Sequence, residues 1–397
     1  MKEILLAKYG EIVLKGLNRS YFESVLIKNV KHALNGIGSF HIYAIQSTLY
    51  IIPKNIEDSG PFEENIITKA QSRLKKVFGI ATVVTAAETE KDMESIVRTA
   101  VSYLNERLSS VKTFKVEAKR SDKHFYLKSP EICRDVGAAL LEAFPNLTVD
   151  VHNPEIQVVV EIRDKAAYVH AGGVPGAGGM PAGTSGKGVL MLSGGIDSPI
   201  AGYLMARRGM ALTAVYFSTP PYTSDRATDK VARLAQRVAS YAGPFDLVVV
   251  PFTDIQMQIN AKCPENLFTL VMRRCMIRIS QLICEKRGGG AIVTGESLAQ
   301  VASQTLPAIA ATDDAVSLPV FRPLIGLDKE DIITFARKID TFDISIEPYE
   351  DCCALFSPKH PKTNPNLTEV REAEQMVGAD AMFEEAILNA KIIRINP

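Results

Sequence analysis

A short glycine- and serine-containing string is the part of this sequence that points most directly to chemistry. Residues 193–199 read Ser-Gly-Gly-Ile-Asp-Ser-Pro and follow the apolar run Val189–Leu192. Two glycines let a backbone turn tightly, and we expect Ser198 to cap the next helix with Pro199 in its first turn. A helix start offers free N–H groups and a positive dipole end. The string therefore predicts an anion site, with Asp197 binding Mg²⁺ or orienting the loop.

The competing interpretation of the string is a plain strand–turn–helix junction. A glycine pair alone would favour that interpretation. The complete Ser-Gly-Gly-x-Asp-Ser pattern at a strand end favours a phosphate-binding loop instead.

The cysteines supply a second candidate for chemistry. Cys352 and Cys353 are adjacent in a polar, proline-rich segment, residues 348–365, where a thiol is reactive rather than packed. A zinc site would need a spaced pair such as CxxC, and a disulfide between neighbours would be strained because their Cα atoms lie only about 3.8 Å apart. We therefore expect one of these thiols to act chemically. We expect Cys133, Cys275 and Cys284 to be core residues and leave Cys263 open.

A basic stretch is the third candidate. The formal net charge is zero, with 45 Lys+Arg and 45 Asp+Glu, so nucleic-acid binding needs a local patch. Residues 112–128 interleave cations with Phe114, His124, Phe125 and Tyr126, which suits phosphate contacts plus base stacking. A solvated strand face is the alternative. The candidate RNA-binding cations are Lys112, Lys115, Lys119, Arg120, Lys123 and Lys128.

The elements that must position these residues follow from hydrophobic patterning. From residue 188 onward, continuous apolar runs at 189–192, 211–217, 247–251 and 291–294 alternate with amphipathic stretches at 198–208, 225–241 and 265–286. This alternation predicts an α/β domain with a doubly wound parallel sheet. Ligands in such sheets bind at the carboxyl ends of the strands, where Leu192, Phe217 and Gly295 lie.

The preceding residues predict two small α+β units. We place them at residues 1–60 and 61–171, with a polar, turn-rich boundary between them. Residues 172–187 are rich in glycine, so we expect a flexible linker without persistent structure there. The sequence has no 18-residue apolar run and no signal-peptide pattern, so we expect a cytoplasmic protein that does not cross a membrane.

The string at 193–198 resembles the pyrophosphate loop (PP-loop) of the ATP pyrophosphatase superfamily, whose members adenylate a carbonyl oxygen with ATP. Further segments narrow the resemblance to the tRNA 4-thiouridine synthetases, which are tRNA sulfurtransferases of the thiamine-biosynthesis type. These segments are 8–19, 114–120, 129–132, 271–274, 295–305, 321–325, 328–330 and 350–353. The resemblance implies a ferredoxin-like domain at 1–60, an RNA-binding THUMP domain at 61–171 and a PP-loop catalytic domain at 188–397. It also implies that a C-terminal rhodanese domain is not part of this chain.

The resemblance also assigns roles to residues. It implies catalytic roles for Asp197, Lys329 and Cys352, with the transferred sulfur carried on Cys352. Lys329 lies at a predicted helix start, where a cation is disfavoured unless it has a partner such as phosphate. The residues expected to contact ATP are Met191, Leu192, Ser193, Gly194, Gly195, Asp197, Ser198, Tyr216, Phe217, Arg273, Gly295 and Gln304.

The implied reaction is ATP-dependent formation of 4-thiouridine, expected at position 8 of tRNA, with Mg²⁺ accompanying ATP. A cysteine desulfurase would load a persulfide onto Cys352. After sulfur transfer Cys352 would form a disulfide, for which an external thiol is our first choice of partner and Cys263 our second. The resemblance further implies sulfur donation to the thiazole of thiamine through a sulfur-carrier protein, and we expect a homodimer. The alternatives are another PP-loop ligase or amidotransferase, and a non-catalytic or methylating THUMP protein that binds RNA.

Overall fold

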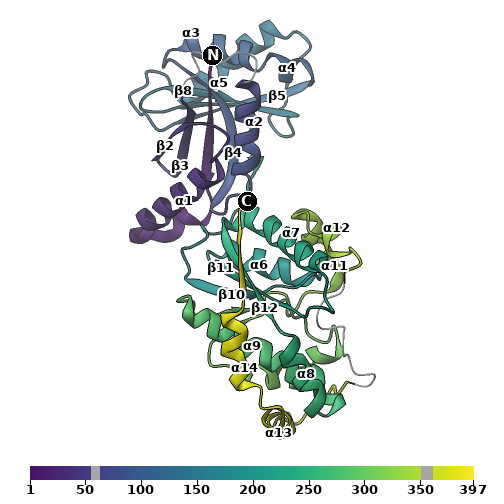
Figure 1. The fold of residues 1–397 in the computed structure, drawn as a ribbon. Coiled ribbons are helices and arrows are strands. Elements are labelled where there is room, and N and C mark those ends of the chain that lie inside the picture. The colour runs from purple at the N-terminus through teal and green to yellow at the C-terminus, as the bar shows by residue number, and fades with distance from the viewer. Residues whose placement is uncertain (55–62, 350–360) are drawn as a thin grey trace. The chain divides into compact units, whose positions relative to one another are not determined.

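The chain forms two compact units, which span Met1–Gly179 and Met180–Pro397. A computed structural model describes residues 1–54, 63–349 and 361–397 (Figure 1). The predicted sulfur carrier, Cys352, and its neighbour Cys353 lie outside the described residues. No helix in the described ranges is both long and apolar enough to cross a bilayer.

The described part of the N-terminal unit holds one sheet with the strand order β2-β3-β1-β4-β8-β7-β5-β6, and β9 pairs with β4. The strands are β1 (Lys2–Tyr9), β2 (Phe40–Ile45), β3 (Thr48–Pro53), β4 (Ile80–Thr89), β5 (Thr113–Arg120), β6 (Thr148–Val149), β7 (Ile156–Ile162), β8 (Ala167–His170) and β9 (Val174–Pro175). The helices are η1 (Glu11–Asn18), α1 (Arg19–Ala33), α2 (Glu63–Leu74), α3 (Met93–Tyr103), α4 (Asn105–Ser109) and α5 (Ser129–Ala143).

Antiparallel pairing builds most of this sheet, and short polar turns join two of the pairs, β2 to β3 and β7 to β8. Strand β4 pairs with β1 although it follows residue 60 in the chain. The sheet that contains the N-terminal strands therefore continues beyond the first boundary that we placed. Helix α5 begins at Ser129 with Pro130 in its first turn, where proline's missing N–H costs nothing.

The glycine-rich segment is more ordered than the sequence indicated. Our expectation that no element persists there is wrong at residues 174–175, because β9 pairs with Thr82 and Val83 of β4. A Cβ on Gly173 would lie 2.7 Å from the Thr82 side chain, and one on Gly176 would lie 2.3 Å from a carbonyl of β4. The glycines therefore permit close packing against a strand rather than flexibility alone.

A buried carboxylate connects β7 to β1 in this unit. Glu161 is fully buried, and its oxygens lie 2.5 Å from Lys8 Nζ, 2.5 Å from Arg163 Nη2 and 3.3 Å from His170 Nε2. Burial alone would raise the pKa of the Glu161 carboxyl. The hydrogen bonds with His170, Lys8 and Arg163, together with the charge of Lys8, outweigh burial, so the pKa of the Glu161 carboxyl is held well below its usual range.

The C-terminal unit contains the predicted parallel sheet, with the order β14-β13-β10-β11-β12-β15. Its strands are β10 (Lys187–Met191), β11 (Ala211–Ser218), β12 (Phe245–Pro251), β13 (Ile292–Val293), β14 (Val320–Phe321) and β15 (Lys391–Ile395). Among the described strands of this sheet, only β15 pairs antiparallel with its neighbour. The chain winds outward from β10 in both directions, so the topological switch point lies between β10 and β13.

Helices cover both faces of this sheet, which confirms the doubly wound class (Figure 1). One face carries α6 (Asp197–Arg207), α7 (Asp225–Ala242), α11 (Lys329–Lys338) and α12 (Phe342–Ser345). The other carries α8 (Thr253–Lys262), η3 (Glu265–Leu267), α9 (Phe268–Lys286), α10 (Leu306–Asp313), α13 (Leu367–Val377) and α14 (Asp380–Leu388). Helix α9 packs its apolar residues into a buried hydrophobic cluster of this unit.

Candidate active site

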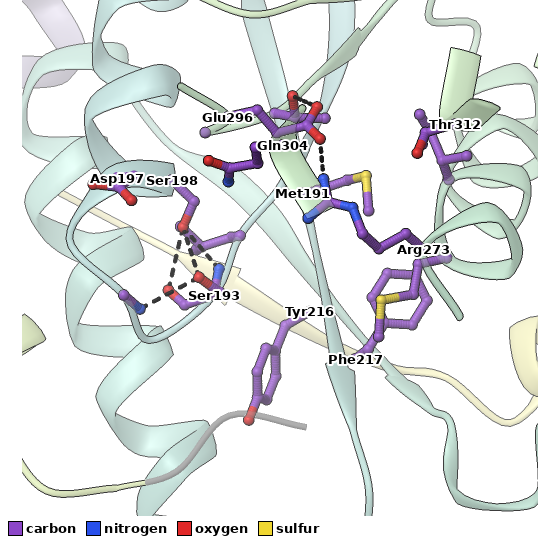
Figure 2. Close-up of a pocket in the computed structure, with 16 residues that line it drawn as sticks. Met191, Ser193, Asp197, Ser198, Tyr216, Phe217, Arg273, Glu296, Gln304 and Thr312 are labelled. Carbon is purple, nitrogen blue, oxygen red and sulfur yellow. Dashed lines mark hydrogen bonds and ion pairs between the residues drawn. The ribbon is translucent and has the colours of Figure 1, made fainter. Parts of the chain in front are cut away.

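A cavity of about 210 Å³ lies at the carboxyl ends of β10, β11 and β13, beside the switch point. Its wall comes from these strand ends, the start of α6, the middle of α9 and the short helix η4 (Ala302–Gln304), as Figure 2 shows. The lining residues are Met191, Leu192, Ser193, Gly195, Asp197, Ser198, Tyr216, Phe217, Arg273, Met276, Ile277, Thr294, Gly295, Glu296, Gln304 and Thr312. The fold thus gathers eleven of the twelve residues expected to contact ATP, and the twelfth, Gly194, belongs to the same loop.

The loop at 193–198 is held in shape by its two serines. The Ser193 amide donates to Ser198 Oγ over 2.9 Å, the two hydroxyl oxygens are 3.2 Å apart, and the Gly195 amide donates to Ser193 Oγ over 3.3 Å. Our prediction that Ser198 caps the helix is wrong, because α6 begins one residue earlier, at Asp197, and the Ser198 hydroxyl closes the loop instead. The resulting turn lies against the cavity at the start of α6 (Figure 2).

Gly295 sets how closely the strand-end segments pack. A Cβ at this position would lie 2.7 Å from the backbone nitrogen of Ser198. Any side chain there would push the segment after β13 away from the start of α6. The sequence motif therefore needs glycine at 295 for close approach rather than for an unusual backbone angle.

Asp197 faces two polar partners that approach from later in the chain. One carboxylate oxygen accepts a hydrogen bond from Lys329 Nζ over 2.7 Å, and the other accepts one from Gln300 Nε2 over 2.8 Å. Lys329 is the first residue of α11, as predicted, and Asp328 caps that helix by accepting from the Asp331 amide. The structure thus brings Lys329 to the loop, although it does not line the cavity.

A buried carboxylate at the back of the cavity was missed by the sequence analysis. Glu296 is 3% exposed and binds Arg273, Arg322 Nε over 2.7 Å and Thr294 Oγ1 over 2.8 Å. Burial would raise the pKa of the Glu296 carboxyl, but the charges of the two arginines outweigh it and hold the pKa below its usual value. Glu296 and Arg322 belong to quoted motifs, so motif membership was the signal that could have found them.

Two polar atoms of the cavity wall are left without hydrogen bonds. Arg273 Nε and Gln304 Oε1 are both buried and have no partner among the described residues. A buried donor or acceptor without a partner is costly, so these positions are suited to a polar ligand. Another part of the wall is apolar and includes Met191, Phe217 and Met276, a surface that suits a flat ring.

Comparison with known proteins decides the family. A family model described as "Thiamine biosynthesis protein (ThiI)" matches residues 183–378, a THUMP model matches 90–170 and a "ThiI ferredoxin-like domain" model matches 4–84. A "Probable tRNA sulfurtransferase" of Caldanaerobacter subterraneus subsp. tengcongensis is 48% identical over 98% of this chain and 100% of its own length. One of Thermoanaerobacter sp. is 50% identical over 98% of this chain and 100% of its own. The chain belongs to the tRNA sulfurtransferase family.

A solved structure also resembles this family member throughout. It is described as a "4-thiouridine synthetase - RNA complex with bound ATP", with a TM-score of 0.90 and 34% identity over 100% of both chains. The ferredoxin-like, THUMP and PP-loop parts predicted from the sequence are therefore present in this order. The two N-terminal models meet between residues 84 and 90, later than the boundary that we placed at residue 60.

The four described cysteines of this sulfurtransferase family member differ in how deeply they are buried. Cys275 and Cys284 are buried, as predicted, whereas Cys133 is only half-buried in α5. Burial raises the pKa of the Cys263 thiol to about 11, so very little thiolate forms there at neutral pH. Cys263 is therefore a weak candidate for resolving a persulfide.

The basic stretch divides between exposed and structural cations. Lys112, Lys119, Lys123 and Lys128 are exposed, and Lys115 Nζ donates to the Val151 carbonyl over 3.3 Å. The Arg120 guanidinium instead donates to three loop carbonyls, at 3.5, 2.6 and 3.1 Å. Tyr126 is 68% exposed beside the buried Phe125, so its ring is available for stacking. Arg120 thus organises the loop that presents Lys123 and Tyr126.

Proposed function

We propose that this chain makes 4-thiouridine in tRNA by two half-reactions, adenylation of the uridine C4 oxygen and delivery of a persulfide sulfur from Cys352. Family membership supports the general activity, which is ATP-dependent thiolation of tRNA. The observation that best supports the proposed mechanism is a cavity lined by the PP-loop, the strand ends and two buried polar atoms without hydrogen-bond partners among the described residues.

In this proposal ATP binds with its base against the apolar wall near Tyr216 and Phe217. Its phosphates lie along the loop at 193–198, where backbone N–H groups and the positive end of α6 favour anions. The carboxylate of Asp197 could serve as one ligand of the Mg²⁺ that accompanies ATP, and the phosphates would supply others, because Mg²⁺ is commonly held by one or two carboxylates plus phosphates. When bound, Mg²⁺ would neutralise part of the phosphate charge.

The first half-reaction needs charge stabilisation more than a proton relay. The uridine C4 oxygen attacks the α-phosphate, the α–β bond breaks, and pyrophosphate leaves with the electron pair. Negative charge grows on the phosphates as this happens, and the loop amides and Lys329 Nζ are fixed donors beside it. The ion pair between Lys329 and Asp197 holds the ammonium at the loop before substrate arrives.

The second half-reaction transfers sulfur. The terminal sulfur of a Cys352 persulfide attacks C4, and AMP leaves. A second thiol then attacks Cys352 Sγ, the S–S bond breaks, and a disulfide forms while the sulfur stays on C4. The raised pKa of the Cys263 thiol favours an external thiol for this step. A cysteine desulfurase would reload the persulfide.

The proposal includes wider partners. The exposed lysines of residues 112–128 and Tyr126 would contact tRNA, with phosphate contacts dominating affinity. The description of the matched family model supports a second role, sulfur donation to a thiazole sulfur-carrier protein for thiamine. A homodimer remains part of the proposal.

The deciding experiment incubates the protein with ATP, Mg²⁺, tRNA and a desulfurase with cysteine, then digests the tRNA and measures 4-thiouridine. Cys352→Ser should lose thiolation but retain tRNA-dependent AMP formation. Free sulfide should bypass the relay by attacking the adenylated base directly. Full thiolation by Cys352→Ser with the desulfurase would refute the persulfide assignment. ATP cleavage that depends on ammonia rather than tRNA would favour a PP-loop ligase, and tRNA binding without ATP cleavage would favour a non-catalytic THUMP protein.

A further inference from the structure

The chain between β13 and α10 forms a short loop, residues 297–303, beside the cavity proposed to bind ATP. The residues that flank this loop, Glu296 and Gln304, are buried and line the cavity (Figure 2). Within the loop, Leu298 and Val301 are 50% and 51% exposed. The loop therefore places an accessible, partly apolar surface next to the cavity.

Gln300 is the residue of this loop that reaches the PP-loop. Its side-chain nitrogen donates to Asp197 Oδ2 over 2.8 Å, while Lys329 Nζ donates to the other carboxylate oxygen. The preceding residue, Ala299, has a φ of 62°, a left-handed conformation that is uncommon for a residue with a Cβ. The Ala299 amide donates to the Gln304 carbonyl over 2.9 Å, which holds this turn. Backbone conformations of this kind persist where the surrounding structure fixes them, and they cluster at ligand-binding loops.

The contact with Asp197 decides which end of the Gln300 amide is presented to a ligand. A carboxamide has a nitrogen that donates and an oxygen that accepts, whereas an ionised carboxylate only accepts. Asp197 therefore holds the nitrogen end of the amide. The oxygen end accepts no hydrogen bond from the described residues, and Gln300 is exposed. The side chain thus offers a neutral acceptor beside the PP-loop.

The target base of the proposed reaction must approach the same place. Its C4 oxygen has to come within about 3–3.5 Å of the α-phosphorus before it attacks. The cavity holds about 210 Å³, less than the about 300–1,000 Å³ of pockets that enclose a whole ligand, so ATP fills it and the base lies at its mouth. Asp197 lines the cavity, yet its side chain is 20% exposed. Its partner Gln300 therefore lies at that mouth.

Uracil carries a group that matches the free acceptor. When the C4 oxygen of uracil faces the phosphorus, the adjacent N3–H is the donor that remains on that edge of the base. Cytosine has an unprotonated N3, which is itself an acceptor and is rejected by a second acceptor. Enzymes that act on a single base read it by hydrogen bonds to this edge and by contacts with apolar side chains.

We propose that Gln300 recognises the target uracil, with its side-chain oxygen accepting a hydrogen bond from N3–H and with Leu298 and Val301 giving apolar contact to the base. Asp197 supports this recognition by holding the amide in one orientation. The inference rests on the proposed function, because it takes a tRNA uridine as the group that is adenylated.

The alternative role for Gln300 is to orient Asp197 alone. Losing that role would slow adenylation but would leave the enzyme's ranking of two bases unchanged. The two roles are separated by the ratio of affinities for two tRNA transcripts that carry uridine or cytidine at the target position. Phosphate contacts to the rest of the tRNA are the same for both transcripts and cancel in this ratio.

The test uses the full-length protein with α,β-methylene-ATP, which cannot be cleaved between its α- and β-phosphates, and measures the Kd of each transcript by filter binding. The parent should bind the uridine transcript at least about threefold more tightly, the effect of one net hydrogen bond. Gln300→Leu keeps most of the side chain's size but has no acceptor, so its ratio should fall to about 1.

Asp197→Asn tests the orientation of the amide. Asparagine both donates and accepts, so Gln300 is free to turn its nitrogen toward the base. The ratio should fall to about 1 or below, because a nitrogen in that place donates to N3 of cytosine. A ratio equal to the parent's would show that Asp197 does not set the recognition.

Gln157→Leu is the matched control. Gln157 is also an exposed glutamine whose nitrogen donates to a carboxylate, that of Glu117, over 2.5 Å. It belongs to the N-terminal unit, so its loss should leave the ratio of the two affinities unchanged.

Two results would overturn the recognition role. One is a parent protein that binds both transcripts equally, and the other is a Gln300→Leu ratio equal to that of Gln157→Leu, even if adenylation is slower. Failure of the proposed function appears differently, as a parent protein that forms no AMP from ATP with the uridine transcript.

Discussion

Replacing Glu296 with glutamine tests the buried charge cluster behind the cavity. The change preserves shape but removes the negative charge that Arg273 and Arg322 share. One carboxylate oxygen accepts from Arg273 and the other from Arg322 and Thr294, so a glutamine can keep only one side. Its amide group would then face a guanidinium. Arg322 retains Asp313 at 2.5 Å, so the loss falls on Arg273.

The magnitude follows from burial. Breaking a buried ion pair by removing one partner costs about 3–5 kcal/mol, and the partly exposed Arg273 places this site near the lower end, about 3 kcal/mol. For a unit of this size each kcal/mol lowers the Tm by about 2–4 °C, so we expect a fall of about 6–12 °C. ATP affinity should fall as well, because the freed Arg273 lines the cavity.

Calorimetry of the full chain measures the effect, with Asp313→Asn as the control. Asp313 binds the same Arg322 but is 45% exposed, so its neutralisation should cost about 1 kcal/mol or less. A Tm loss for Glu296→Gln no larger than that of Asp313→Asn would refute the reasoning. An unchanged Kd for ATP would show that Arg273 does not depend on Glu296 for its position.

Three further outcomes are expected. Asp197→Ala should abolish tRNA-dependent pyrophosphate release while tRNA affinity, measured by filter binding, stays within about twofold, because the basic stretch lies in the other unit. Lys119→Ala and Lys123→Ala should each weaken tRNA binding and reduce the slope of log K against log salt by about 1, whereas Arg120→Ala should lower the Tm. Because the pKa of Glu161 is depressed in the fold, its stabilisation is present above about pH 4.5 and is lost as pH falls further, so the hydrogen-exchange protection factors of the β7 amides should fall steeply below that pH in the parent and weakly in Glu161→Gln.

The sequence was sufficient for the elements that carry strong patterns. Continuous apolar runs identified β10 to β13, because strands buried on both faces must be apolar throughout. The glycines at 194 and 195, in the loop that follows β10, marked the edge of the cavity. It was insufficient where a residue's role depends on distant partners. Glu296 looks like an ordinary exposed glutamate until Arg273 and Arg322 surround it, and Arg120 looks like an RNA-binding cation until three carbonyls surround it.

The same limitation applies to neighbouring arginines. Arg273 and Arg274 are adjacent on α9, yet Arg274, 4% exposed, binds Glu374 and Asp314, while Arg273 lines the cavity. Their opposite roles follow from which side of α9 each one faces. That direction is set by packing of the whole unit and not by local sequence.

The close approach at Gly295 has a consequence for how variation in such chains is interpreted. Because a side chain there would meet the Ser198 backbone at 2.7 Å, the position works as a spacer between two segments. Gly295→Ala would behave in an activity screen like loss of a catalytic group, although glycine offers no functional side chain. A related sequence with a larger residue at this position must have moved its phosphate loop, so this one position reports whether the cavity is intact.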